Sequence, residues 1–547
     1  MKKLAWMAIL VAVLGFGLAE GGWAEEPKTG GILRYRITAD PPNLDPAQAV
    51  DTDALRGVNL MFEQLVDYDS DANKVVPLLA ESWESNADAT VWTFHLRRGV
   101  HFHKTCGGEP TANGGREMTA ADVKYSFERM IRTNCPRIYF IDMVKGYRDL
   151  VSADTTGAKE WTGIKVLDDH TVQFELEYPF APFLTVLTYD SYVVVVPEDA
   201  EKWGKEFNFH PVGTGPFAFD KWTHDSILSL KKHDAYWMKD PAGHPLPYAD
   251  GVELVILPDD TIAYEEFKKG NIDIFPDCPD EVYQEVKATL GPKGQFQQRP
   301  WLGTFYWCFN LEKEPFQNNL KLRQALNYAV DRAAVNDVVL NGRYFVATGV
   351  LPPGMPGYNA DLKGYGYDPE KAKALLKEAG FENGFEVTLQ IASNKRQKAI
   401  AEAIQGQLAN LGITLKIQEV DKGAHLDTVH RGETVLSRNS WVVDYVDPDN
   451  FLHVLFHSSN HGGKGNYSRY SNPEVDQLLD EARRETDWTK RIALYQKAEQ
   501  QIVDAAPWLF LYYFTTDIMF NADIHGVNIP AMGEYKTKLT AVWKDPQ

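Results

Sequence analysis

The sequence has few cysteines, an excess of acidic over basic residues, and no long apolar run after residue 18. Its 56 Lys and Arg against 76 Asp and Glu give a net charge of −20. That charge repels polyphosphates and anionic membranes and excludes the basic surface of a nucleic-acid-binding protein. No later stretch is long enough for a transmembrane helix.

The local signatures of common enzyme classes are also missing. The sequence contains no G-x-S-x-G, no H-E-x-x-H, no G-x-x-x-x-G-K-[ST] and no G-x-G-x-x-G. We therefore predict a protein that is not an enzyme, with no catalytic residue and no cofactor. A catalytic triad needs no local motif, so an exported hydrolase or a chaperone stays open as a hypothesis.

What is present describes a large folded protein. The 547 residues are 44% hydrophobic and include 14 Trp, 25 Tyr and 27 Phe, a content that a disordered chain does not have. The length predicts three or four lobes. Strand and helix patterns alternate almost throughout, which predicts α/β lobes.

The first residues are typical of a secretory signal. Two lysines precede an apolar run from Leu4 to Leu18, which is too short to span a bilayer. We predict a signal peptide over residues 1–24, with cleavage before Glu25; Gly17 and Ala19 offer a competing site. No cysteine lies at either point, so we predict a periplasmic protein without a lipid anchor.

Four cysteines in an exported protein predict two disulfides. Their spacing favours Cys106 with Cys135 and Cys278 with Cys308. Each pair would close a loop of about thirty residues, worth about 3 kcal/mol. All three connectivities remain possible.

Two histidine clusters offer metal ligands. His453, His457 and His461 recur at spacing four, which would align them on a helix, and His101 and His103 share one face of a predicted strand. The first run breaks down where its helix should end, and strand histidines more often pack or hydrogen-bond. We predict no metal site.

Several elements are well signalled. A capping box, Thr119 with Asp122, begins one helix. A second helix is predicted over 321–340, and a third follows the N-cap Asp368. A strand at 385–391, a helix at 397–410 and a strand at 413–420 predict a β-α-β unit with parallel strands.

The most informative segment is WVVDYVDPDNFLHVLF, residues 441–456. Asp444 interrupts an apolar run, where an ionised carboxylate is costly unless it meets a cation or several donors. It would hold a ligand ammonium beside the indole of Trp441. Alternatively, it pairs internally with an arginine such as Arg438, or caps a helix that begins near Asp447. The residues alone favour neither hypothesis.

Several segments together resemble the extracellular solute-binding proteins of family 5, the oligopeptide-, dipeptide- and nickel-binding proteins of ABC importers. The resemblance lies in LAESWESNADATVWTFHLRRGVHFH, TAADVKYSFERM, PVGTGPF, LRQALNYAVDR, LPPGMPGYN, DPEKAKALLKEAGF and DYVDPDNFL, in the family's order. It covers nearly the whole chain after the signal peptide.

The resemblance implies an α/β fold of the periplasmic-binding-protein type II class, with two lobes joined by a two-strand hinge and an extra lobe inserted in the first. TFYWCFNL and PWLFLYYF would be the hinge strands. The implied division is lobe I over 25–69, 198–303 and 507–547, inserted lobe II over 70–197, and lobe III over 304–506.

The resemblance also implies function. The protein would capture peptides by hinge closure and deliver them to an inner-membrane ABC permease, acting as a monomer without nucleic acid. By the family's pattern, Asp444 receives the ligand's α-ammonium beside Trp441 and the backbone of Ser440 and Val442. Asp40 would be a second contact from the other lobe.

One departure leaves the ligand open. No residue matches the arginine that fixes the carboxylate in dipeptide-specific members, because Arg396 is displaced toward the following helix. A longer peptide or a different amine is therefore allowed. The alternative function is the same fold binding a nickel chelate, an oligosaccharide or another small solute.

Overall fold

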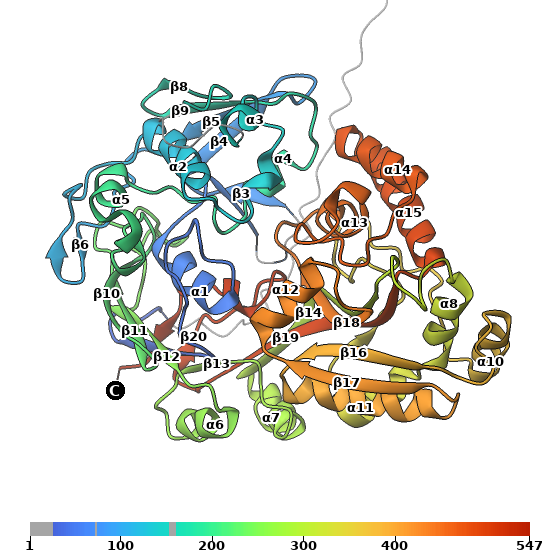
Figure 1. Ribbon diagram of the computed structural model, residues 1–547. Helices are drawn as coiled ribbons and strands as arrows, with labels where there is room; N and C mark the ends of the chain where they lie inside the picture. The colour runs from blue at the N-terminus through green and yellow to red at the C-terminus, as the bar shows by residue number, and fades with distance from the viewer. Residues whose placement is uncertain (1–25, 70, 72–73, 152–159, 547) are drawn as a thin grey trace, which may run out of the picture.

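The computed structural model describes residues 26–69, 71, 74–151 and 160–546 (Figure 1). The predicted signal peptide lies outside the described residues. Within them, no helix has the length and apolar character needed to cross a membrane.

The largest sheet has eleven strands, and its order is β10-β11-β12-β1-β13-β19-β14-β18-β16-β17, with β15 paired to β19. The strands that belong to predicted lobe I are β1 (Ile32–Ile37), β10 (Phe217–Thr223), β11 (Ile227–Lys232), β12 (Gly251–Ile256) and β13 (Ile274–Pro276). Those of predicted lobe III are β15 (Phe345–Val346), β16 (Glu386–Ala392), β17 (Thr414–Val420) and β18 (Leu436–Val442).

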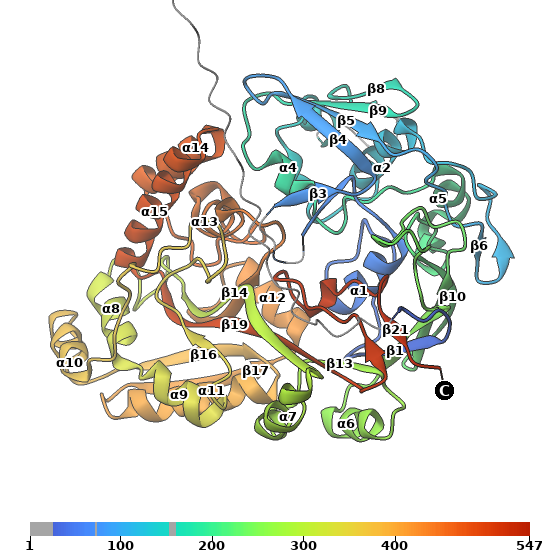
Figure 2. The same ribbon diagram turned by 180° about the vertical axis from the view of Figure 1, so that it is seen from behind.

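Two long antiparallel strands join these halves, β14 (Phe296–Phe309) and β19 (Trp508–Phe520). At one end β19 pairs with β13, and at the other β14 pairs with β18. Figure 2 shows both strands running from the lobe III sheet toward β13 and lobe I. The two-strand hinge is thereby confirmed.

Lobe II has its own antiparallel sheet, in the order β4-β5-β9-β8. These strands are β4 (Ala80–Ser85), β5 (Val91–Leu96), β8 (Ile164–Asp168) and β9 (Thr171–Glu175). Helix α2 (Ala120–Arg132) packs on this sheet and begins with the predicted capping box of Thr119 and Asp122. The lobe boundaries themselves remain a prediction.

Helices flank both halves of the large sheet (Figure 1). Lobe I contains α1 (Thr52–Met61), α5 (Pro197–Trp203), which begins at the predicted lobe boundary, α6 (Asp260–Lys268) and α7 (Tyr283–Thr289). Lobe II contains, besides α2, the short helices α3 (Tyr147–Val151) and α4 (Phe183–Val186). In lobe III they are α8 (Leu320–Ala329), α9 (Arg332–Val339), α10 (Pro369–Glu378), α11 (Lys395–Ala409), α12 (Lys422–His430), α13 (Pro448–Phe456), α14 (Pro473–Arg484) and α15 (Trp488–Ala505). The short strands are β2 (Val66–Tyr68), β3 (Val75–Pro77), β6 (Thr105–Cys106), β7 (Glu109–Pro110), β20 (Ile524–His525) and β21 (Trp543–Lys544).

Most predicted lobe III elements are confirmed, and one is corrected. Strands β16 and β17 are parallel and joined by α11, and Asp368 caps α10 by accepting from the amide of Lys371 at 2.9 Å. The single helix predicted over 321–340 is wrong, because it is two helices. Val330 is extended, and the Asp331 side chain caps α9 through the amide of Ala334 at 3.0 Å.

The predicted disulfides are wrong, because all four cysteines are buried free thiols. Cys278 donates its amide to Asp517, which pairs with Gln298 near one end of β14. Cys308 lies at the other end, about ten residues or 33 Å along the strand. A disulfide needs Cα atoms within about 7 Å. The prediction from sequence spacing fails for Cys278 and Cys308 because an extended strand holds them apart.

The hydrophobic core crosses the predicted lobe boundaries. One continuous cluster joins lobe II to the part of lobe III around α13. Across this contact Phe140 packs edge-on against Tyr445, with ring centroids 5.2 Å apart. The amide of Ala181 also donates to the carbonyl of Arg483 at 2.8 Å. The structure thus has lobes II and III closed on each other.

Candidate functional site

Strand β18 has a partly open edge. On one side it pairs with β14 from Leu436 to Val442. On the other side β16 reaches only Leu436 and Ser437. In the described part of the chain, the segment 438–442 has no strand partner on that side, and Ser440 and Val442 in it are half-buried. Such an edge can pair with an extended backbone.

Asp444 lies just beyond this edge. The Asn450 side chain holds it, since Asp444 donates its amide to Asn450 Oδ1 at 3.0 Å and accepts from Asn450 Nδ2 at 3.4 Å. Among the described residues, no basic nitrogen lies within 4.0 Å of its carboxylate. Burial raises the pKa of Asp444, and the charge of Arg137 is the strongest influence that lowers it again.

Trp441 is fixed by the same amide group. Its indole Nε1 donates to Asn450 Oδ1 at 3.1 Å. Asn450 is fully buried in the first turn of α13, which Asp447 caps. One buried side chain therefore sets both the aromatic ring and the carboxylate that the sequence singles out. The hypothesis that Asp444 caps this helix is wrong, because Asp447 caps α13.

The other predicted contact, Asp40, lies elsewhere. Its carboxylate accepts from Trp222 Nε1 at 2.7 Å and pairs with His224 Nδ1 at 2.6 Å. Both partners belong to β10 and the turn after it, in lobe I. A ligand role for Asp40 remains a prediction, and these two groups already engage its carboxylate.

Arg438 lies on the same strand as Trp441, and the sequence suggested it only as an internal partner of Asp444. Its guanidinium lies 4.6 Å from the centre of the Phe305 ring and bonds to the amide oxygen of Gln397. No carboxylate lies within 4.0 Å of it in the described chain. Burial lowers the pKa of Arg438 to about 10, so this cation is short of a counter-charge.

Arg137 reaches the same region from lobe II. Its guanidinium lies 5.7 Å from the centre of the Trp441 ring. Burial opposes its charge, but the attraction of Asp444 leaves the pKa of Arg137 raised. Nothing in the sequence signals this contact, because about 300 residues separate Arg137 from Asp444 and only the packing of lobe II on lobe III brings them together.

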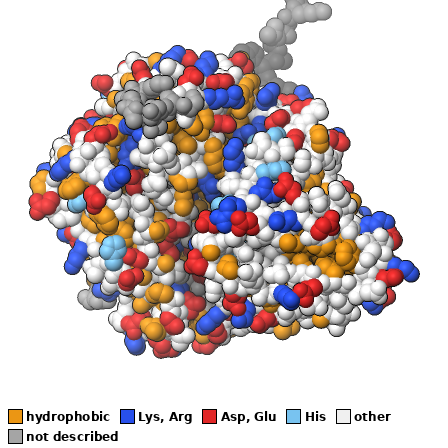
Figure 3. All heavy atoms as spheres, viewed as in Figure 1, with side chains coloured by type: hydrophobic (Ala, Val, Ile, Leu, Met, Phe, Trp, Pro, Cys, Tyr) orange, Lys and Arg blue, Asp and Glu red, His pale blue; other side chains and the backbone are white. Residues whose placement is uncertain are grey.

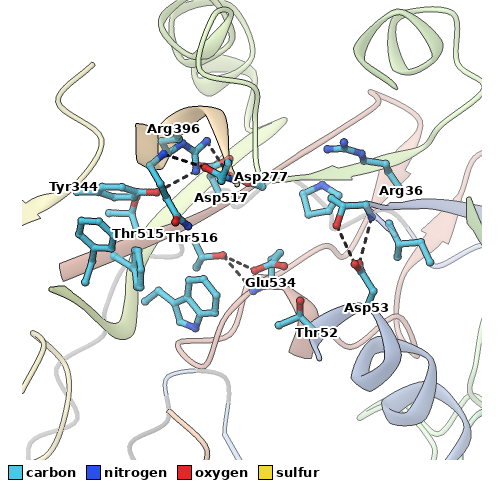
Figure 4. A pocket seen from close by; sticks show the side chains of 18 of the residues that line it. Arg36, Thr52, Asp53, Asp277, Tyr344, Arg396, Thr515, Thr516, Asp517 and Glu534 are labelled. Carbon is cyan, nitrogen blue, oxygen red and sulfur yellow. Dashed lines mark hydrogen bonds and ion pairs between the residues drawn. The ribbon is translucent and has the colours of Figure 1, made fainter. Parts of the chain in front are cut away.

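A cavity of about 260 Å³ opens between lobes I and III beside the hinge strands (Figure 4). Its wall carries both charge signs and several aromatic rings, including Arg438 and Phe305. Figure 4 shows Arg396 beside Tyr344, Asp277 and Asp517 on one side of the cavity, with Glu534 between this group and Asp53. Arg396 donates to Asp280 at 2.7 Å, so an acidic partner already occupies it.

The face of the molecule in Figure 3 carries acidic and basic side chains side by side, without a broad patch of one sign. On this face, therefore, no broad electrostatic field of one sign adds to the individual charges of the site. Asp444 and Arg438 differ from these surface charges because both are half-buried and neither has an opposite charge in contact among the described residues.

One of the two histidine clusters is brought together by the fold. Nitrogen atoms of His453 and His457 and a carboxylate oxygen of Asp480 lie within 4.8 Å of one another. However, the Arg483 guanidinium lies 3.1 Å from His453 Nε2, where a bound cation would meet a positive charge. His461 is not part of this group, since its Nε2 bonds to the carbonyl of Tyr470.

Known proteins are similar to this chain over most of its length. Residues 74–463 match the bacterial extracellular solute-binding proteins, family 5, middle region. The chain is 32% identical to the dipeptide-binding protein of Escherichia coli over 495 residues, which cover 87% of this chain and 88% of that protein. It is 36% identical to heme-binding protein A of Haemophilus influenzae over 461 residues, covering 82% and 81%.

A solved structure is similar over almost the same extent. The periplasmic binding protein DppA of Helicobacter pylori, associated with an ABC transporter and solved in complex with the peptide STSA, superposes with a TM-score of 0.78. It is 29% identical in sequence, and the match covers 95% of this chain and 99% of that one.

Proposed function

This chain belongs to the bacterial extracellular solute-binding proteins of family 5, and from that premise we propose that it is the peptide-capturing periplasmic subunit of an ABC importer. Its partner would be an inner-membrane permease, and it would act as an exported monomer without cofactor or nucleic acid. The relative named for dipeptides and the structure solved with a peptide support this assignment.

One observation carries the proposal: the half-buried Asp444 carboxylate, at the end of an open strand edge, has no cation in contact within the described part of the chain. Asp444 would receive the ligand's α-ammonium in a charge-assisted hydrogen bond. The ligand backbone would pair with Ser440 and Val442, as in strand addition, and Trp441 would form the adjoining wall.

Arg438 would receive the ligand's terminal carboxylate. It lies four residues before Val442 on β18, about 13 Å along the strand. An extended dipeptide spans at most about 7 Å, and the ammonium site at Asp444 lies beyond Val442, so this spacing suits a peptide longer than a dipeptide. The missing dipeptide-type arginine agrees with that length.

Capture would occur by closure about β14 and β19. Ligand contacts with both lobes would stabilise the closed form over the open form, which is how a ligand shifts a two-state population. A dissociation constant near 1 μM, about −8 kcal/mol, would be enough for such a shift. The permease would then recognise the closed form.

A second candidate is a non-peptide solute, which the 36% identity to a protein named for heme favours. Native mass spectrometry of protein purified from a periplasm separates the two. A ladder of peptide masses supports peptide capture, whereas a single non-peptide mass supports the second candidate.

Calorimetric titration tests the role of Asp444. The protein should bind tri- and tetra-alanine, and the Asp444→Asn variant should bind them about 2 to 5 kcal/mol more weakly. N-acetylation of the peptide should weaken binding to the natural protein by a similar amount and change little in the variant.

The matched control is Asp427→Asn, an exposed aspartate on α12. This variant should bind like the natural protein. If the natural protein binds free and acetylated peptides equally, Asp444 does not bind the ligand's ammonium. If it binds no peptide at all, the proposed function is wrong.

A further inference from the structure

Arg137 is an unusual residue for a lobe that takes no part in the predicted ligand contacts. It lies between α2 and the short helical turn Ile138–Ile141, and its guanidinium is 5.7 Å from the ring centre of Trp441 and 5.9 Å from that of Phe140. Its Nε is buried and has no hydrogen-bond partner in the described chain. No carboxylate among the described residues lies within 4.0 Å of it.

Asp444 is the anion whose charge acts most strongly on Arg137. Trp441 and Asp444 are both anchored on Asn450 Oδ1, at 3.1 and 3.0 Å, so the ring beside Arg137 and the carboxylate are held in one rigid unit. Of the other charges that act on Asp444, Lys536 and Asp190 are paired with each other. One cation and one anion thus stand beside the same indole, withdrawn from water and not in contact with each other.

Among the described residues neither charge has an opposite charge in contact, which is costly when each is partly removed from water. A direct ion pair would lower that cost, yet the Arg137 guanidinium and the Asp444 carboxylate lie more than 4.0 Å apart. A ligand group that carries an ammonium and a carboxylate close together would satisfy both at once.

We infer that Arg137 and Asp444 together bind the first residue of the ligand, and that this residue bears a carboxylate beside its ammonium. This inference rests on the proposed function and deepens it. Asp444 takes the ammonium and Arg137 takes the carboxylate through its planar fork of N–H donors, with Trp441 as the wall between them. The ligand class is peptides that begin with an acidic residue, linked through either its α- or its γ-carboxyl group.

Calorimetric titration with three tripeptides tests the inference: Glu-Ala-Ala, its γ-linked isomer, and Gln-Ala-Ala as the uncharged isostere. The natural protein should bind at least one glutamyl peptide tenfold or more tightly than Gln-Ala-Ala. The Arg137→Gln variant should lose this preference or reverse it, because Asp444 would then repel the extra carboxylate. Its affinity for Gln-Ala-Ala should fall less than its affinity for the preferred glutamyl peptide.

Two further variants keep the test sharp. Arg148→Gln makes the same change at an exposed arginine of lobe II and should keep the full preference. Arg137→Lys keeps the charge without the fork and should retain a reduced preference. The two glutamyl isomers then tell which linkage the site accepts.

The inference is overturned if the natural protein binds all three tripeptides equally, or if the preference survives Arg137→Gln. Either result leaves the proposed function intact, because peptides still bind. Failure of every tripeptide to bind would contradict both the inference and the proposed function.

Discussion

The hydroxyl of Tyr68 lies 3.1 Å from both the amide nitrogen and the carbonyl oxygen of Val446. Tyr68 ends β2, whereas Val446 belongs to the loop between Asp444 and α13. One side chain therefore fastens the loop that carries the proposed ammonium site to a segment nearly 400 residues earlier in the chain. The ligand loop is positioned from outside lobe III.

Replacing Tyr68 with Phe keeps the ring and removes both hydrogen bonds. Val446 would then lose partners for its amide and its carbonyl, at a cost of about 1 to 3 kcal/mol. Because the contact joins lobe I to lobe III, we expect it to be lost when the lobes open, and we therefore expect tri-alanine to bind about 5- to 150-fold more weakly to the variant by calorimetry. Tyr367→Phe, at an exposed tyrosine, is the control, and unchanged affinity in Tyr68→Phe would show that the contact does not hold the closed form.

Arg343 is a buried cation at the centre of a charge cluster beside the hinge. Its guanidinium donates to Asp517 at 2.6 Å and to Asp277 and Asp280 at 2.8 Å. The Arg343 and Asp517 side chains are 1% and 0% exposed. Arg343, in the segment after α9 of lobe III, is thereby joined to β19 through Asp517. It is also joined to the loop after β13 of lobe I through Asp277 and Asp280.

Arg343→Met would leave the Asp517 carboxylate buried without its cation. Breaking a buried pair in this way costs about 3 to 5 kcal/mol, so the urea midpoint of the variant should fall clearly. Arg431→Met removes an exposed arginine paired with Glu433 and should change stability by less than about 1 kcal/mol. Equal midpoints for Arg343→Met and the natural protein would mean that the cluster does not stabilise the fold.

The fold was predictable where the signal is local. Asp368 and Pro369 mark the start of α10 because capping is decided within one turn, and the parallel β16-α11-β17 unit follows from periodicity. The break between α8 and α9 was missed, although Asp331 carries its signal. Only the folded chain shows that this carboxylate turns back to cap α9.

The site divides in the same way. Asp444 stands out in the sequence because a charge in an apolar run needs an explanation. Arg137 does not, since a single arginine at the end of a helix is ordinary until lobe II is packed against Trp441. The cysteines failed for the related reason that pairing depends on distances in space, which spacing in sequence does not give.

The four thiols give a direct chemical prediction. Unfolded in guanidinium chloride without reductant, the protein should react with four equivalents of a thiol reagent, and its intact mass should not change on reduction. In the native state reaction should be slow, because burial raises the pKa of Cys106 to about 12 and that of Cys135 to about 11, and the thiolate is the reactive form. If two or four of the cysteines fail to react, the protein contains one or two disulfides after all.

Glu499 predicts how stability depends on pH. Its Oε1 accepts from the amides of Val350 and Leu351 at 2.8 Å, while its Oε2 is buried without a partner in the described chain. Burial raises its pKa to about 7, from 4.5. Between these two values the folded state holds a proton that the unfolded state has released. Glu499 therefore stabilises the fold fully below pH 4.5 and progressively less as the pH rises toward and past 7.

Glu499→Gln keeps an oxygen for both amides and carries no charge at any pH. The free energy of unfolding of this variant, relative to the natural protein, should therefore rise by about 3 kcal/mol between about pH 4.5 and pH 8. Urea unfolding at several pH values measures the difference. Glu402→Gln, on an exposed face of α11, should show no such trend, because its carboxyl meets water in both states. If the difference between Glu499→Gln and the natural protein stays constant over this range, then the pKa of Glu499 is the same in the folded and unfolded states, and its second oxygen must have a partner such as a buried water molecule.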